Sequence, residues 1–297
     1  MLWPHANAMA QIASVEYLTQ LKLLFPGSRS ALNNPWYLVA SVAFSASNRP
    51  EGVPAVFRYA LDELQREQAR RASEDVEVLK EQLQLARRSR DCLLQSGLLS
   101  GYSRSINGLV ALHEAMPTEL RDTKTLRDIE KPIQDFAKDG RTLYRAMYGD
   151  NADRVQALLD DIYPDMGLYS TRLLVPARAD RIQTGWFSNT IGYGVVYGGA
   201  DVLTQVESSF VIATANIAMG TPRQIAWHLK NAMNGGATLE EVQAVQVNCR
   251  EESESATVKI YDEKNVNVEI IGLFIAFFRT LERRGMSIDQ NDFMDLR

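Results

Sequence analysis

The sequence predicts an all-α fold, and three observations lead to this prediction. Apolar residues recur at helical spacing through most of the chain, proline and glycine punctuate these runs, and strand-like patterns are confined to short pieces such as residues 256–261. At 297 residues and 45% hydrophobic composition, the chain can bury a substantial core. We therefore expect a globular helical protein.

The first quarter of the chain predicts three helices. Residues 9–25 are amphipathic and are closed by Pro26 and Gly27, while residues 35–47 are apolar with small and aromatic side chains. Pro50 then interrupts the pattern, and residues 54–64 begin the next helix.

Residues 62–90 are densely charged, which is typical of a solvated helix face. The alternative is an oligomer contact through the apolar side chains in this run, which are Val76, Leu79, Leu83 and Leu85. Residues 93–112 return to apolar character, with a turn predicted at Gly101.

The middle of the chain has weaker patterns. Residues 117–150 are polar and resemble a linker, and residues 143–163 predict one further helix. Residues 164–199 are rich in glycine and aromatic side chains without a clear period, so we expect a long loop that lines a pocket. Residues 270–281 predict a last helix.

Residues 205–247 predict a helical hairpin followed by a third helix. The first helix runs over 208–219, Gly220 to Pro222 form the turn, and the second helix covers 223–233. Thr238 and Glu241 have the spacing of a capping box at the start of the third helix.

This hairpin resembles the carboxymuconolactone decarboxylase family, whose superfamily includes the alkylhydroperoxidase D-like (AhpD-like) proteins. The resemblance rests on the order and spacing of Glu207, Gly220, Pro222, His228, Ala232, Gly236, Thr238, Glu240, Glu241 and Val242. It implies an AhpD-like helical fold, assembly into a homo-oligomer, and a site on this hairpin.

An internal repeat is predicted when residues 35–61 are laid over 207–233, an offset of 172 residues. Pro50 then aligns with Pro222, but Pro35 and Val56 replace Glu207 and His228. Two degenerate repeats would form one pseudo-symmetric unit. The predicted organisation is an N-terminal helical extension at 1–34, a first repeat at 35–116, a helical linker at 117–185, and a second repeat with the site at 186–297.

His228 and Glu207 are the candidate catalytic residues. A carboxylate beside an imidazole in an apolar pocket makes an acid–base pair, in which His228 delivers a proton and Glu207 holds its tautomer. The structural alternative is a buried histidine together with a Glu207 that caps a helix or pairs with another group. Predicted substrate-binding residues are Tyr193, Tyr197, Trp186, Gln224 and Tyr102. Ser208 and Gln224 replace the arginine and glutamate that the family often has, so the usual family substrate is in doubt.

The peroxidase branch of the superfamily uses a Cys-x-x-Cys pair, and neither Cys92 nor Cys249 has a partner at that spacing. Thiol peroxidase chemistry is therefore not expected. No spacing predicts a metal site, and we expect no cofactor.

A net charge of −5 without a long basic cluster argues against nucleic-acid binding. The most apolar run, residues 266–278, is too short to span a membrane. We expect a cytoplasmic protein, with a mitochondrial location left open. Two functions are predicted: a cofactor-independent lyase or isomerase on a small carboxylated or lactone-like metabolite, and a catalytically inactive scaffold or small-molecule binding protein.

Overall fold

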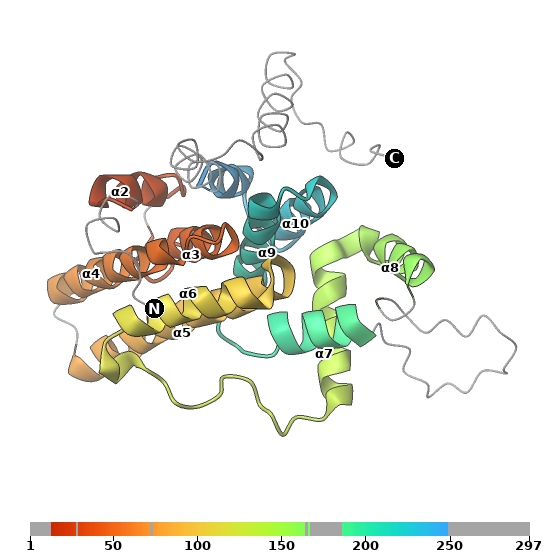
Figure 1. Ribbon diagram of the computed structural model, residues 1–297, viewed down its shortest axis with the longest axis horizontal. Coiled ribbons are helices and arrows are strands. Elements are labelled where there is room, and N and C mark those ends of the chain that lie inside the picture. Colours follow the sequence, from red (N-terminus) through yellow and green to blue (C-terminus); the bar gives the residue numbers. More distant parts are fainter. Residues whose placement is uncertain (1–12, 28, 72–73, 164–165, 167–185, 249–297) are drawn as a thin grey trace, which may run out of the picture. The chain divides into compact units, whose positions relative to one another are not determined.

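The computed structural model describes residues 13–27, 29–71, 74–163, 166 and 186–248 (Figure 1). Every element formed by these residues is helical, which confirms the all-α prediction. They lie in one compact unit, Met1–Ser253. The predictions for Cys249 and for residues 256–261, 266–278 and 270–281 fall outside the described residues.

Helix α3 (Trp36–Ala46) forms the centre of the described core. All 11 of its residues are buried, because apolar and small side chains surround the helix on every face. It contacts α4 (Val53–Arg71), α5 (Asp75–Ser100), α6 (Tyr102–Ala115) and α9 (Gln205–Met219). The prediction of an apolar helix over 35–47 is confirmed.

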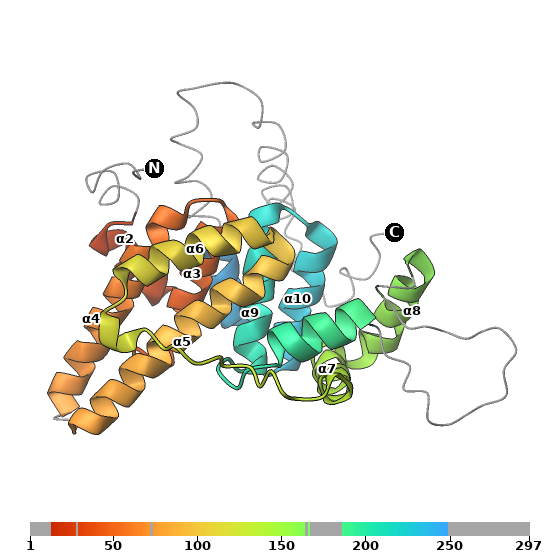
Figure 2. The ribbon, with the colours of Figure 1, turned by 60° about the horizontal axis from the view of Figure 1, so that its bottom comes forward.

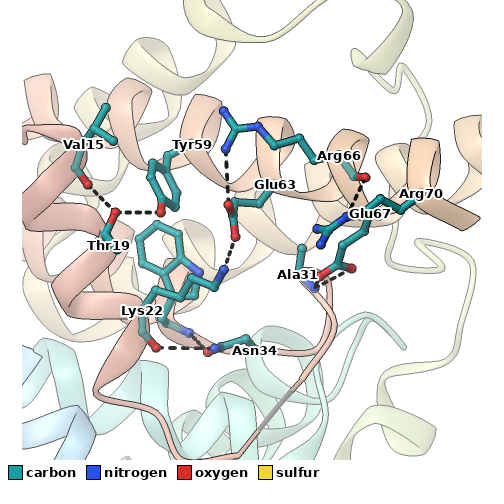
Figure 3. A network of polar contacts seen from close by, with 11 residues as sticks. Val15, Thr19, Lys22, Ala31, Asn34, Tyr59, Glu63, Arg66, Glu67 and Arg70 are labelled. Carbon is teal, nitrogen blue, oxygen red and sulfur yellow. Dashed lines mark hydrogen bonds and ion pairs between the residues drawn. The ribbon is translucent and has the colours of Figure 1, made fainter.

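Helix α2 (Val15–Leu23) is held against α4 by polar contacts, shown in Figure 3. The Thr19 and Tyr59 hydroxyls are 2.9 Å apart, and Lys22 forms an ion pair with Glu63. The Glu67 carboxylate accepts the backbone N–H of Ala31 at 2.9 and 3.0 Å. These bonds fix the chain before α3, so α2 is part of the packed unit.

The charged run of residues 62–90 lies on two helices, since α4 ends at Arg71 and α5 begins at Asp75. Figures 1 and 2 show the end of α4 beside the start of α5. Val76 is 81% exposed, whereas Leu85 is fully buried. The run therefore has a solvated face, as predicted, and its apolar side chains do not share one environment.

The predicted linker at 117–150 and the predicted helix at 143–163 need correction. The chain forms α7 (Ile133–Tyr148) and α8 (Ala152–Ile162), separated at Gly149, whose φ is 52°. Many charged residues lie between the apolar residues of α7 in the sequence, so the segment was interpreted as polar. The helix buries Phe136, Tyr144, Met147 and Tyr148. This helix belongs to the core.

The predicted loop at 164–199 is also wrong where the structure describes it. Residues Trp186–Tyr197 form a π-helical segment, η4, which packs on α7. A Cβ on Gly140 would lie 1.9 Å from the carbonyl oxygen of Asn189, and a Cβ on Gly194 would lie 2.2 Å from that of Phe136. These two glycines therefore allow the backbones of α7 and η4 to approach closely.

The predicted hairpin is confirmed as α9 and α10 (Pro222–Asn234). Gly220 ends α9 in the left-handed region with φ of 66°. Asn48, at the matching position 172 residues earlier, has φ of 58° after α3. Residues 239–248 are helical, and Thr238 and Glu241 form the predicted capping box.

Candidate functional site

Glu207 is buried in the first turn of α9, where it has two structural partners. Its carboxylate accepts the backbone N–H of Thr204 at 2.9 Å, and its own N–H donates to the Thr204 hydroxyl at 3.2 Å. This reciprocal capping box fixes the start of the helix. Glu207 also forms an ion pair with Arg88 of α5, which is buried as well.

The Arg88 guanidinium reaches a third helix as well. It lies 6.0 Å from the ring centroid of Tyr37 in α3. Burial alone would lower the pKa of Arg88, but the nearby Tyr37 and Glu207 reverse this and raise it. Burial in turn raises the pKa of the Tyr37 phenol. Glu207 is thus part of a charged link between α5 and α9.

His228 lies in the middle of α10 and is 6% exposed. Its Nδ1 is 3.3 Å from the side-chain amide of Asn231, three residues along the same helix. Its ring packs edge-on against Tyr148 of α7, with centroids 5.9 Å apart. Burial lowers the pKa of His228 from 6.5 to about 3, so the imidazole is neutral at physiological pH.

The described contacts do not bring Glu207 and His228 together. Val206 packs beside Gly235 across the hairpin, which fixes the register of α9 against α10. By this register His228 lies level with Ala213, roughly six residues or about 9 Å along the helix axis from Glu207. The expected role of Glu207 as the group that holds the His228 tautomer is not what the geometry presents, since Asn231 occupies that position.

Two of the predicted substrate-binding tyrosines lie near His228 but within packed structure. Tyr193 is buried and packs against Tyr148, with ring centroids 6.2 Å apart. Tyr197 is buried and packs against Tyr193 at 5.3 Å. These rings form one aromatic cluster with Tyr144. They contribute to the apolar surroundings of His228 through Tyr148.

The other predicted substrate-binding residues lie apart from this cluster. Trp186 is 54% exposed and Tyr102 is 73% exposed, and Gln224 is exposed on α10. None of the three has a described contact with His228. A cleft of about 100 Å³ lies elsewhere, between the start of α4 and the end of α6, and is lined by Pro50, Glu51, Pro54, Arg58, Ala111, Glu114 and Ala115.

Arg88, Tyr148 and Asn231 were missed by the sequence analysis. Arg88 lay in a run interpreted as a solvated face, and Tyr148 lay where the predicted linker at 117–150 overlaps the predicted helix at 143–163. Only Asn231 had a usable signal, because its spacing of three residues from His228 places both on one face of a helix.

Two features of the described residues bear on metal and thiol chemistry. No group of three or more histidine, cysteine, aspartate or glutamate side chains there could hold a metal ion. Cys92 is fully buried, and burial raises the pKa of its thiol, which disfavours the reactive thiolate. Within the described part of the chain, no helix is both long enough and apolar enough to cross a membrane.

Comparison with known proteins identifies two similar fungal proteins. Peroxisomal protein 2 of Saccharomyces cerevisiae is 27% identical over an alignment of 284 positions, which covers 80% of this chain and 93% of that protein. Peroxisomal protein 2 of Schizosaccharomyces pombe is 24% identical over 210 positions, which cover 71% of this chain and 81% of that protein. No family model matches the chain, and no solved structure matches it at a significant level.

Proposed function

We propose that the chain is a cofactor-independent lyase or isomerase that moves a proton on a small carboxylated or lactone-like metabolite. The observation that supports this best is the environment of His228, a buried neutral imidazole that is anchored at Nδ1 and faces aromatic side chains. A neutral imidazole accepts a proton, so His228 acts as the base, and Glu207 caps α9, the helix that packs against α10.

The charge of the substrate follows from the same environment. Burial is the cause of the low pKa of His228, and no carboxylate of the described residues contacts its ring. A substrate carboxylate placed near the imidazole would raise that pKa and make His228 a stronger base. A small organic acid with an acidic C–H beside a carbonyl group is the substrate class that fits.

We further propose that the protein works in peroxisomes as a homo-oligomer. The names of both relatives support the location, and the resemblance to the AhpD-like family supports the assembly. Fluorescence microscopy of the tagged chain beside a peroxisomal marker tests the location. Light scattering of the purified protein tests the assembly.

Turnover tests the proposed chemistry. The protein is incubated with a panel of lactone acids and β-keto acids, and carbon dioxide release and ultraviolet absorbance are followed. Activity should disappear in a folded His228→Gln variant. It should remain in Lys230→Gln, which alters an exposed side chain on the same helix. Activity that survives His228→Gln would show that the base lies elsewhere.

A second candidate function is a catalytically inactive scaffold or small-molecule binding protein. It is favoured by the engagement of Glu207, whose carboxylate is occupied by Thr204 and Arg88. A folded wild type that binds members of the panel without converting them supports this candidate and contradicts the lyase proposal.

A further inference from the structure

The side-chain amide of Asn231 lies between two kinds of neighbour. One of its two terminal atoms faces the Nδ1 atom of His228 at 3.3 Å. The other faces two backbone carbonyl oxygens, those of Trp227 at 2.9 Å and Met147 at 3.1 Å. Asn231 is 2% exposed and His228 is 6% exposed, so water competes weakly for these positions.

The two carbonyl oxygens determine how the amide is oriented. A carbonyl oxygen only accepts hydrogen bonds, so the atom that faces Trp227 and Met147 must be the donor, Nδ2. The atom that faces His228 is therefore Oδ1, which only accepts. A hydrogen bond at this position requires that His228 Nδ1 carries the proton.

We propose that Asn231 is a positioning residue that holds His228 in its Nδ1-protonated neutral tautomer and leaves the Nε2 lone pair to act as the base. This inference rests on the proposed function for the role of the base, but the tautomer itself is a property of the free protein. The bond from Nδ1 to Asn231 is the only hydrogen bond that this imidazole forms with the described residues. Nε2 is thus the nitrogen left for a substrate.

The surrounding contacts keep Asn231 in place. Its bond to Met147 connects α10 to the last turn of α7. Asn234 donates to the same Met147 oxygen at 2.7 Å and strengthens this link. The ring of Tyr148, the next residue in α7, packs against His228 with centroids 5.9 Å apart. The orientation of His228 therefore depends on the docking of α7.

Nitrogen NMR of ¹⁵N-histidine-labelled protein tests the tautomer without any substrate. The chain contains three histidines, and a His228→Gln variant identifies the His228 signals by their loss. At neutral pH we expect Nδ1 of His228 to resonate as a protonated nitrogen and Nε2 as an unprotonated one. A wild-type spectrum with the proton on Nε2, or on both nitrogens, would overturn the proposal.

A matched pair of variants tests the role of Asn231. Asn231→Leu keeps the approximate size of the side chain but removes the acceptor, and it should shift the His228 proton toward Nε2. Lys230→Leu changes an exposed side chain on the same helix, and it should leave the tautomer unchanged. An unchanged tautomer in folded Asn231→Leu would contradict the positioning role.

Activity separates this inference from the proposed function. If a substrate is turned over, Asn231→Leu should lower kcat and Lys230→Leu should not. If nothing is turned over but the wild-type tautomer is Nδ1-protonated, the proposed lyase function fails while the structural assignment holds. Loss of activity in Asn231→Leu without a change of tautomer would contradict the assignment.

Discussion

At the scale of single residues, Glu207 and His228 lie in two separate environments. The sequence had suggested that these buried polar side chains form one catalytic pair. Glu207 is bound to a cation and a helix cap, whereas His228 is bound to an amide and an aromatic ring. Each environment contributes differently to the free energy of unfolding. Both contributions can be measured without a substrate.

The stability of the protein should depend on pH through His228. The pKa of this residue is about 3 in the folded chain and near 6.5 when unfolded, so the unfolded chain binds more protons between these values. The contribution of His228 is fully present above pH 6.5 and is lost by about 1.4 kcal/mol per unit as the pH falls toward 3.

Urea denaturation of wild type and His228→Gln between pH 7 and 4 measures this contribution. The difference in unfolding free energy between the two proteins should shrink as the pH falls. His113→Gln is the control, because His113 is exposed on α6. A difference that stays constant across the range would show that His228 is not buried in its neutral form.

The Arg88–Glu207 ion pair should behave as a coupled unit. Arg88→Met or Glu207→Gln alone leaves one buried group without its partner and should cost about 3–5 kcal/mol of stability. Glutamine at 207 retains the capping geometry, so the double variant should cost clearly less than the sum of the single variants. Chemical denaturation measures all three.

The control for this cycle is the exposed pair Arg145–Asp153, whose side chains are 64% and 79% exposed. Arg145→Met should change stability by about 0–1 kcal/mol. Additive effects of Arg88→Met and Glu207→Gln would contradict the coupling.

At the scale of elements, the close crossing of α7 and η4 depends on glycine. Gly140→Ala would place a methyl group 1.9 Å from the Asn189 carbonyl oxygen, and backbone atoms cannot rotate away. We expect a loss of about 1–3 kcal/mol or more in thermal or urea unfolding. Gly192→Ala in η4 is the matched control, since its nearest contact is 3.5 Å and stability should change little. Equal stability of the two variants would show that the helices cross less closely.

The helices differ in how far the local sequence predicted them. The α9–α10 hairpin was predictable because apolar spacing, Gly220 and Pro222 are local features that agree with one another. Helix α7 also had a local signal, because Phe136, Gly140 and Tyr144 recur at helical spacing, but the charged residues between them led to its interpretation as a linker. Its packing against η4, in contrast, is a tertiary property. The same limit applied to the site. Asn231 shares a helix with His228, but the Arg88 contact joins residues 119 positions apart.

At the scale of the whole described unit, His228 lies at the boundary between two hydrophobic clusters. One cluster surrounds α3 and includes Leu229, and the other contains the tyrosines of α7 and η4, with Trp227 packed against it. Helix α10 therefore connects both clusters. A change in the packing of either one reaches His228 through its neighbours in the chain.

Amide hydrogen exchange should follow the burial of the helices. Helix α3 has every residue buried and should exchange most slowly, together with the middle of α9. The first turns of α5 are exposed, including Val76, and should exchange much faster. Mass spectrometry of peptides from each helix measures this order. Equal protection of α3 and the first turns of α5 would contradict the described packing.

The left-handed residues after α3 and α9 restrict which amino acids the two turns accept. Asn48 and Gly220 have nearly the same φ, and only glycine, asparagine and aspartate adopt this conformation at low cost. The two residues should therefore be interchangeable, with Asn48→Gly and Gly220→Asn both retained in a selection for folded protein. Valine should be eliminated at both positions. A saturation library at these two sites should then select the same few amino acids at both positions, although the sequences around the two turns differ.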